Sequence, residues 1–468
     1  MAFLIGGANT LSAGYDIDNS LRFNYADSPR LLKAGTASAG TTWTHSVWVK
    51  YDSNANYNFL FCDGNQEGVA KNTSGFLYAN TSGDQNGVAV AAATRDYSAW
   101  YHIVTKVSSG AATIYVNNVS VKADATFPSA LTDNLSIGSF HREDTDPDQY
   151  NYFHGGYMAD VNFIDGSALN PSSFAEADED SGIWKPIDTS DLTFGTNGFR
   201  LEFKNSAVGT GASDTIGADT SGNDNHFTST NVAVTDQTTD SPTNNWCTLN
   251  SLTARGSTGN TLAEGNLQYS AVAGAGDSSV FGTIGIPPEM KVYFEVKLVQ
   301  NTAQNAVGIH SSYDCGDGEY CRGGSEVGTY SFKPRGSASV TQYFTDNDGG
   351  ATNHDVNNAA NDTILGVAID NENGQIHYHL DGTYINSSDP TDNNPVALVT
   401  GFGGASEQYI HTSLDTSGGT EPINQFNFGN PVHSISSSQS DDNGYGNFEF
   451  DVPAGYYALC TKNLAKYG

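Results

Sequence analysis

The sequence predicts an all-β protein of two tandem β-sandwiches with very little helix. Short segments with the two-residue alternation of strands recur along its 468 residues. Between them lie asparagine- and glycine-containing pairs that suit tight hairpin turns. Helical periodicity is almost absent, since the best candidate, 170–182, predicts two turns at most. Many short strands separated by turn residues are typical of β-sandwiches.

The first half of the sequence carries several strand-like segments. Residues 42–52 show the alternation most clearly. Residues 112–123 are predicted as two strands joined by Asn117 and Asn118, a pair that suits the positive φ angles of a hairpin turn. Further strands are expected at 100–107, 134–140, 155–165 and 198–206.

The second half repeats this pattern. Residues 362–385 contain the pairs Asn373-Gly374 and Asp381-Gly382, which predict two hairpin turns and therefore a three-stranded meander. Further strands are expected at 291–299, 305–312, 423–430 and 455–461.

A change of composition marks a domain boundary. Residues 235–250 are polar, carry Pro242 and lack periodicity, as a linker would. The predicted organisation is an N-terminal arm, a first sandwich, a linker and a second sandwich, at 1–18, 19–234, 235–250 and 251–468.

The charge excludes two classes of partner. Acidic residues number 52 against 20 basic ones, for a net charge of -32. Nucleic acid and anionic lipid both attract basic surfaces, so neither is an expected partner. No apolar run reaches the roughly 18 residues of a membrane helix. The N-terminus lacks the basic region of a signal peptide, so we expect assembly inside a cell and use outside it.

The cysteines do not form a recognisable framework. The five are scattered and include no C-x-x-C pair, which argues against a zinc site of that kind. Cys315 and Cys321 either pair across a loop or remain free thiols. The others are Cys62, Cys247 and Cys460.

Residues 19–165 resemble the laminin-G-like, concanavalin A-type jelly roll. The resemblance lies in "NSLRFNYADSPRLLKAG", "WTHSVWVKYD", "SAWYHIVTKV", "ATIYVNNVSV" and "FHGGYMADVNFIDGSALNPSSF". The second half resembles a SPRY-type sandwich in "ILGVAIDNENGQIHYHLDG", "FNFGNPV" and "VPAGYYALCTKNL". The pairing of the two resembles phage virion proteins described as tail fibre, spike or head-surface proteins.

This resemblance implies an exposed virion protein, assembled in the host cytoplasm. The first hypothesis is a tail fibre, spike or head-fibre module that binds host-surface carbohydrate without cleaving it. The alternative is a capsid decoration or tail-assembly protein that uses its sandwiches for protein contacts. Expected partners are other virion proteins and further copies of the chain, with a trimer implied by the resemblance. The arm "MAFLIGGANT" is a candidate virion anchor.

A catalytic role is not expected, and a glycan hydrolase is the lesser alternative. Hydrolases of this fold carry E-x-D-x-x-E on one strand, where alternation places the carboxylates on one face. In "FEFDVPA", Glu449 and Asp451 match but Ala454 replaces the third acid. His377 and His379 lie two apart on a strand, and ordinary surface histidines are expected rather than a metal pair.

The stretch "ADTSGNDNHFTST" leaves two interpretations open. It resembles the D-x-S-G-N-x-N loop of laminin-G-like domains, displaced in a way that suggests circular permutation. Oxygen-rich side chains are calcium ligands, but the EF-hand spacing is not met. The other interpretation is a tight turn with Gly222 in a left-handed conformation. The candidate calcium ligands are Asp219, Ser221, Asn223 and Asp224.

Two polar loops rich in tyrosine are candidates for glycan binding, at 141–156 and 311–324. Exposed aromatic rings stack on sugars, and long loops on a rigid scaffold often carry function. These tyrosines could equally pack against neighbouring subunits. The candidate ligand residues are Tyr150, Tyr152, Asp317 and Tyr320.

Overall fold

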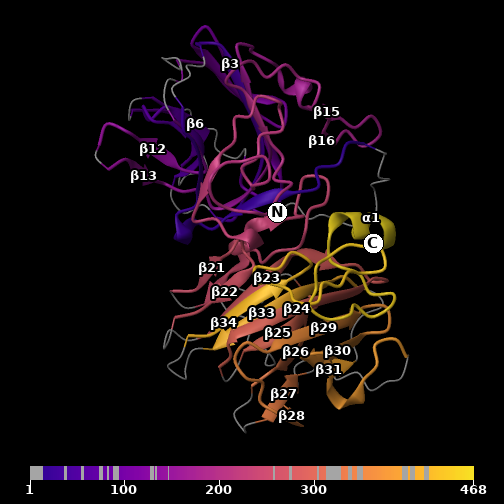
Figure 1. Ribbon diagram of the computed structural model, residues 1–468. Coiled ribbons are helices and arrows are strands. Elements are labelled where there is room, and N and C mark those ends of the chain that lie inside the picture. Colours follow the sequence, from indigo (N-terminus) through magenta and orange to yellow (C-terminus); the bar gives the residue numbers. More distant parts are fainter. Residues whose placement is uncertain are drawn as a thin grey trace. The chain divides into compact units, whose positions relative to one another are not determined.

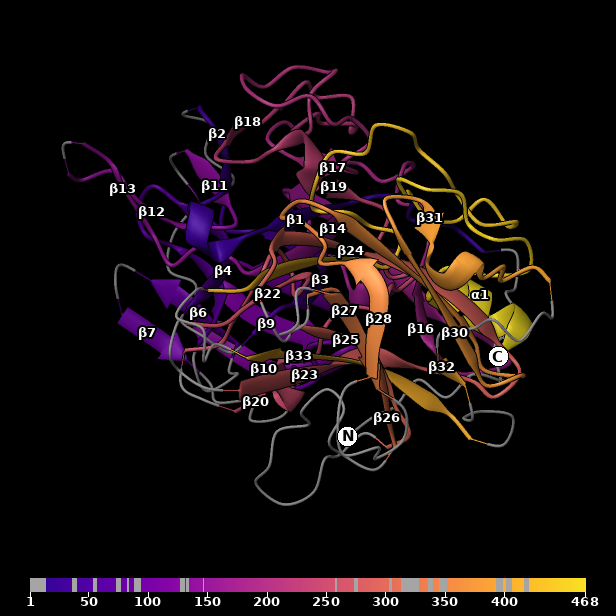
Figure 2. The same ribbon diagram turned by 90° about the horizontal axis from the view of Figure 1, so that it is seen from below.

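The computed structural model describes most of the chain in two compact units, 14–245 and 246–468. Figures 1 and 2 show both units. The described residues are 14–35, 40–53, 57–72, 77–81, 84–87, 94–126, 131, 134–145, 147–256, 259–272, 277–302, 305–312, 328–335, 340–344, 352–392, 399–400, 406–415 and 421–468.

The N-terminal unit contains two large antiparallel sheets. In the first, the strand order is β10 (Val119–Thr126), β9 (Ala111–Val116), β8 (Tyr101–Ser108), β3 (Trp43–Tyr51), β14 (Gly156–Asp165), β1 (Ser20–Phe23) and β19 (Gln237–Thr238), with β17 (Phe199–Leu201) also paired to β14. The second sheet has the order β18 (Thr228–Thr230), β2 (Arg30–Lys33), β11 (Leu135–Ile137), β4 (Asn58–Asp63), β5 (Gly68–Lys71), β6 (Leu77–Thr81) and β7 (Asp84–Gly87).

Two small hairpins accompany these sheets. They are β12 (Phe140–Arg142) with β13 (Gln149–Asn151), and β15 (Ala175–Ala177) with β16 (Trp184–Pro186). The predicted helix at 170–182 is instead one 3-10 turn, η2 (Pro171–Ser173), followed by β15. The remaining 3-10 turns of this unit are η1 (Tyr25–Asp27) and η3 (Val234–Asp236).

The C-terminal unit is also built from two large antiparallel sheets. One has the order β20 (Arg255–Gly256), β23 (Asp277–Ile286), β33 (Gln408–Asp415), β25 (Ala306–His310), β26 (Thr329–Lys333), β27 (Val340–Phe344) and β28 (Thr352–Asn357). The other has the order β21 (Thr261–Ala263), β22 (Gln268–Ser270), β34 (Ile423–Asn427), β24 (Lys291–Gln300), β29 (Ile364–Asp370), β30 (Gln375–Leu380) and β31 (Thr383–Tyr384), with β32 (Val399–Thr400) paired to β30.

Helix is scarce, as predicted. The α-helix of the described residues is α1 (Thr461–Tyr467), and the 3-10 turns of the second unit are η4 (Ser251–Thr253) and η5 (Ile385–Ser387). The described residues contain no helix with the length and hydropathy needed to span a bilayer. The predicted all-β class with two sandwiches is therefore confirmed.

Each unit has its own apolar core. In the first, the core includes Trp43, Leu60 and Phe163, which come from different strands and are at most 1% exposed. In the second, Phe294 and Ile410 belong to a separate buried cluster. Because a sheet buries one face against its partner, two such cores account for two sandwiches.

The predicted turns are confirmed where they fall on described residues. Asn117 and Asn118 have φ angles of 45° and 66° between β9 and β10. Strands β29, β30 and β31 form the predicted meander, with Asp381 and Gly382 both at positive φ.

The predicted arm and linker both contribute packed residues. Ile17 is buried, and its backbone N–H donates to Thr243. In the predicted linker, 235–250, the buried Asp240 carboxylate lies 2.8 Å from Lys50 Nζ. Trp246 is buried in the second unit. The boundary between the units falls inside the predicted linker range, but these residues belong to the folded units rather than to a free connection. Residues 1–13 of the predicted arm lie outside the described residues.

Candidate functional site on the β12–β13 hairpin

The predicted glycan loop 141–156 begins in a short antiparallel hairpin. His141 of β12 lies opposite Tyr150 of β13, and Arg142 lies opposite Gln149. Neighbouring residues of a strand point to opposite faces, so His141 and Arg142 point to different sides of the hairpin. His141 is fully buried, whereas Gln149 and Asn151 are exposed.

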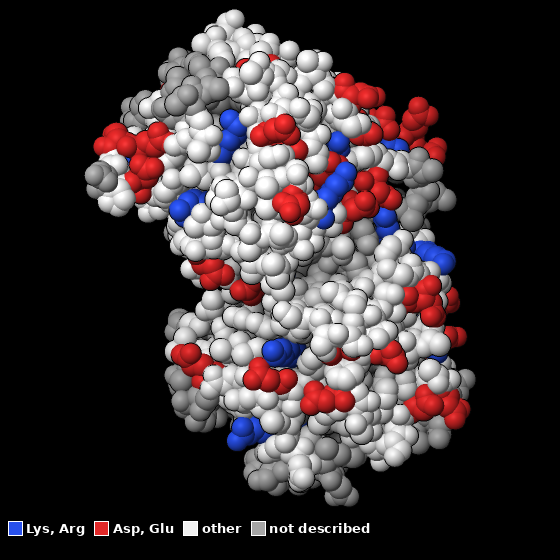
Figure 3. Space-filling view, viewed as in Figure 1, with Lys and Arg blue, Asp and Glu red and all other residues white. Residues whose placement is uncertain are grey.

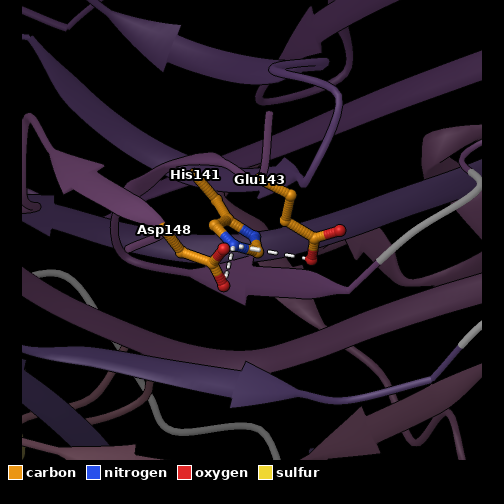
Figure 4. Close-up of side chains that lie close together, drawn as sticks. All are labelled: His141, Glu143 and Asp148. Atoms are coloured by element: carbon orange, nitrogen blue, oxygen red, sulfur yellow. Dashed lines mark ion pairs between the residues drawn. The ribbon is translucent and has the colours of Figure 1, made fainter. Parts of the chain in front are cut away.

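Three potential metal ligands meet where the connecting loop joins the strands of this hairpin (Figure 4). His141 Nε2 lies 3.6 Å from a Glu143 carboxylate oxygen and 3.9 Å from an Asp148 oxygen. One ligand atom from each of the three residues lies within 4.8 Å of the others. The cluster therefore combines one imidazole with two carboxylates that follow β12 and precede β13.

The electrostatics of His141 are set by its burial. Burial lowers the pKa of His141, while Glu143 and Asp148 act to raise it and Arg30 acts to lower it. Neither ring nitrogen of His141 has a hydrogen-bond partner. Burial therefore favours the neutral imidazole, while the two neighbouring acids oppose this shift.

Tyr150 is not a free stacking platform. Its ring stacks on His141 with 4.6 Å between centroids and an interplanar angle of 9°. The Arg30 guanidinium lies 3.9 Å from the centre of the same ring. Burial raises the pKa of Tyr150. Tyr150 therefore acts as a support for His141.

Tyr152 and Tyr25 present aromatic surface to solvent. Tyr152 is 44% exposed and Tyr25 is 36% exposed, and no other aromatic residue reaches that exposure among those whose side-chain burial the structure describes. Tyr152 packs against Phe59, Phe140 and Tyr57. Tyr25 contacts Phe153 edge-on. Both exposed rings thus border the chain that leaves β13.

The candidate calcium loop is a separate feature stabilised by its own hydrogen bonds. Asp219 Oδ1 accepts from the backbone N–H groups of Arg200 and Ser221 at 2.9 Å each. Oδ2 accepts from the Ser221 hydroxyl and the Asn225 N–H, also at 2.9 Å. Asn223 donates to the carbonyls of Gly195 and Gly198. The loop is therefore hydrogen-bonded to the segment 195–198.

These residues do not fit a calcium ion. Calcium binds six to eight oxygens, but both Asp219 oxygens already accept two hydrogen bonds each. The Asp224 side chain is 91% exposed beside His226. Gly222 has a φ of 89° with open space around it, as a tight turn requires. The geometry supports the turn interpretation.

A charged pocket in the N-terminal unit also has a structural explanation. It has a volume of about 210 Å³ and is lined in part by Tyr15, Asp160, Arg200 and Glu202. Arg200 Nε donates to Asp160 Oδ1 at 3.1 Å, and Arg200 Nη2 lies 3.4 Å from Glu202. Burial raises the pKa of Asp160 against the effect of Arg200. Arg200 therefore pairs with two of the acidic residues that line this pocket.

The expectation of surface histidines in the second unit is wrong. His377 and His379 are each 1% exposed, because both faces of β30 are covered. His379 Nε2 lies 2.8 Å from the Tyr293 hydroxyl, and its Nδ1 accepts from the Gly382 N–H. Burial lowers the pKa of each histidine to about 4. His379 is a satisfied core residue.

The carboxylates tested for catalysis are likewise occupied. Glu449 accepts from the Ser436 N–H and hydroxyl, and neither Glu449 nor Asp451 lies on a strand. The buried Glu295 accepts from Tyr293, from Asn427 and from two backbone N–H groups. It anchors the segment that contains Glu449.

Two candidate ligand residues, Asp317 and Tyr320, lie outside the described residues, as do Cys315 and Cys321. The described cysteines, Cys62, Cys247 and Cys460, are buried and free. The sequence predicts a candidate glycan loop at 141–156 but does not single out His141, Glu143 and Asp148. His141 and Glu143, two residues apart, are a weak sequence signal for a metal site. Asp148 comes near them only because the β12–β13 hairpin folds back on itself.

The chain's charge appears at its surface. Acidic side chains are spread over the face seen in Figure 3, with basic side chains among them.

No curated protein matches the sequence.

Solved structures with similar folds are distant in sequence. A putative carbohydrate binding protein from Bacteroides ovatus is 14% identical, with a TM-score of 0.33 over 46% of this chain. The chain spans 58% of that protein. Mouse laminin alpha1 domains LG4-5 are 11% identical, with a TM-score of 0.29 over 97% of this chain and 91% of theirs. The SPRY domain of human HERC1 is 11% identical, with a TM-score of 0.28 over 38% of this chain and 96% of its own. The family model of the concanavalin A-like lectin/glucanases superfamily, Laminin_G_3, matches residues 6–173, a range that includes the β12–β13 hairpin.

Proposed function

We propose that this protein is a non-catalytic glycan-binding module exposed on a bacteriophage particle, where it contacts other virion proteins and further copies of itself. The observation that carries the glycan-binding part is the exposure of Tyr152 and Tyr25 beside the β12–β13 hairpin. The virion part rests on the resemblance of the paired sandwiches to phage surface proteins.

Tyr152 has the properties of a sugar-stacking residue. Its ring is backed by Phe59, Phe140 and Tyr57, so little side-chain entropy is lost when a ligand covers its outer face. Gln149 and Asn151 on β13 are exposed and carry amides suited to sugar hydroxyls. An apolar ring beside amides is the combination that an amphipathic sugar ring needs.

The absence of cleavage in this proposal is supported by the hydrogen bonds of Glu449, which was considered for catalysis, and of the neighbouring buried acid Glu295. Glycoside hydrolysis uses two carboxyl groups about 5–9.5 Å apart around the scissile bond. Glu449 is held by Ser436, and Glu295 is buried and accepts from four donors. Neither is placed to act on a bound sugar.

The test is binding to surface polysaccharide extracted from candidate host bacteria. We expect Tyr152→Ala to weaken binding of the full chain at least tenfold, because stacking on the ring is lost. The matched control is Ile183→Ala, since Ile183 is 48% exposed but belongs to the β15–β16 hairpin. Saturable binding that Tyr152→Ala leaves unchanged, or release of shortened glycan, would contradict the proposal.

A further inference from the structure

We propose that His141, Glu143 and Asp148 form a binding site for a divalent transition metal ion, with Zn²⁺ as the expected occupant. The inference is independent of glycan binding. It rests on the geometry of the three side chains and on the buried imidazole, which lies near both acids but makes no hydrogen bond (Figure 4).

The His141 imidazole is buried and makes no hydrogen bond of good geometry. Its side chain is 0% exposed, and neither ring nitrogen makes a hydrogen bond. A buried polar group without a partner costs about 1–3 kcal/mol, so such groups are rare in folded proteins. Because Nε2 lies near two carboxylates, an ion held between the three ligand atoms would give this nitrogen a partner.

The distances are slightly longer than those between ligands that share one ion. Zinc bonds of about 2.0–2.2 Å in tetrahedral geometry place neighbouring ligand atoms about 3.3–3.5 Å apart. The observed separations from Nε2 are 3.6 Å to Glu143 and 3.9 Å to Asp148. Both separations exceed the length of a hydrogen bond. Small side-chain movements that shorten them would convert the cluster into a coordination site.

The ligand types favour a transition metal over calcium. One imidazole nitrogen and two carboxylate oxygens suit zinc, whereas calcium takes oxygen ligands almost exclusively. Metal binding needs a neutral imidazole and ionised carboxylates. Burial favours the neutral form of His141, and the Asp148 side chain is 44% exposed, which gives an ion access from solvent.

A second layer of contacts orients two of the three ligands. Asn134 Nδ2 donates to Glu143 Oε1, and the Glu143 N–H donates to the Gly64 carbonyl. A Cβ on Gly64 would overlap the Glu143 side chain, so this glycine leaves room for Glu143 in its observed position. Tyr150 stacks on His141 and fixes the plane of its ring. Such supports are usual around metal ligands.

The test is Zn²⁺ titration of the full chain without an affinity tag, followed by calorimetry and melting temperature. We expect one Zn²⁺ per chain and a higher melting temperature with Zn²⁺. Asp148→Asn and Glu143→Gln should each weaken binding at least tenfold. Co²⁺ should show the visible absorption of a low-coordinate site, and His141→Ala should abolish it.

Asp144→Asn is the matched control, because Asp144 lies in the same loop and is exposed but pairs with Arg142 instead. It should bind Zn²⁺ as the original chain does. Two outcomes would overturn the proposal: no Zn²⁺ or Co²⁺ binding to the folded chain, or binding that Asp148→Asn and Glu143→Gln leave unchanged. Because neither measurement involves a glycan, failure of this inference can be distinguished from failure of the proposed function.

Discussion

At the scale of single residues, Asp219 shows how one carboxylate can organise a loop. Its two oxygens accept four hydrogen bonds from Arg200, Ser221 and Asn225. Bonds to an ionised acceptor are stronger than bonds between neutral groups. These hydrogen bonds can hold the loop as a tight turn, although its composition is also compatible with calcium.

Replacing Asp219 tests this role. We expect Asp219→Ala to lower the free energy of unfolding by about 1–3 kcal/mol, because buried N–H groups lose their acceptor. Urea titrations in calcium and in EDTA should show the same loss. Asp224→Ala is the control, since its side chain is 91% exposed. Calcium-dependent stabilisation of the original chain that disappears in Asp219→Ala would restore the metal interpretation.

At the scale of elements, turn residues determine where strands reverse. The β9–β10 turn has two residues at positive φ, Asn117 and Asn118. The Asn117 side chain also accepts from the His102 N–H. Asparagine tolerates this conformation, whereas β-branched residues do not. The hairpin therefore depends on its two asparagines.

Substitutions at Asn118 should separate backbone conformation from side-chain contacts. We expect Asn118→Val to reduce stability by about 1–2 kcal/mol, because valine is strained at positive φ. Asn118→Gly should retain or slightly raise stability, since glycine adopts this conformation freely. Chemical denaturation of both variants measures the difference. Equal losses in the two would show that the asparagine side chain matters more than its backbone conformation.

At the scale of the whole molecule, buried histidines link stability to pH. Burial lowers the pKa of His45, His102 and His154 to about 3. In the unfolded chain a histidine binds a proton near pH 6.5. Between these values the unfolded state binds more protons, so stability falls as the pH drops below about 6.5. Asp52, whose pKa is raised to about 6 by burial, acts in the opposite direction.

His45→Phe isolates one of these contributions. The ring centroids of His45 and Phe61 lie 4.4 Å apart, and neither ring nitrogen of His45 has a hydrogen-bond partner. Between pH 7 and pH 5 we expect the variant to lose about 2 kcal/mol less stability than the original chain. Denaturation at a series of pH values measures this difference. A difference that stays constant with pH would refute the linkage.

Much of the fold is encoded locally and could be predicted. Alternation in 42–52 and the turn pairs Asn117-Asn118 and Asp381-Gly382 act between neighbours in sequence, so their structures follow from the residues themselves. The short helix predicted at 170–182 was replaced by a 3-10 turn and a strand, because pairing of β15 with β16 outweighed a weak helical preference.

The sequence by itself therefore determined the all-β class, the two sandwiches and the main hairpins. Only the tertiary structure decided which polar residues serve the scaffold and which meet at a site. His379 alternates like a surface residue but lies under Phe450 and Tyr384. Glu143 and Asp148 meet His141 because the hairpin folds back on itself. Burial and proximity between separate segments depend on packing, which a local pattern does not contain.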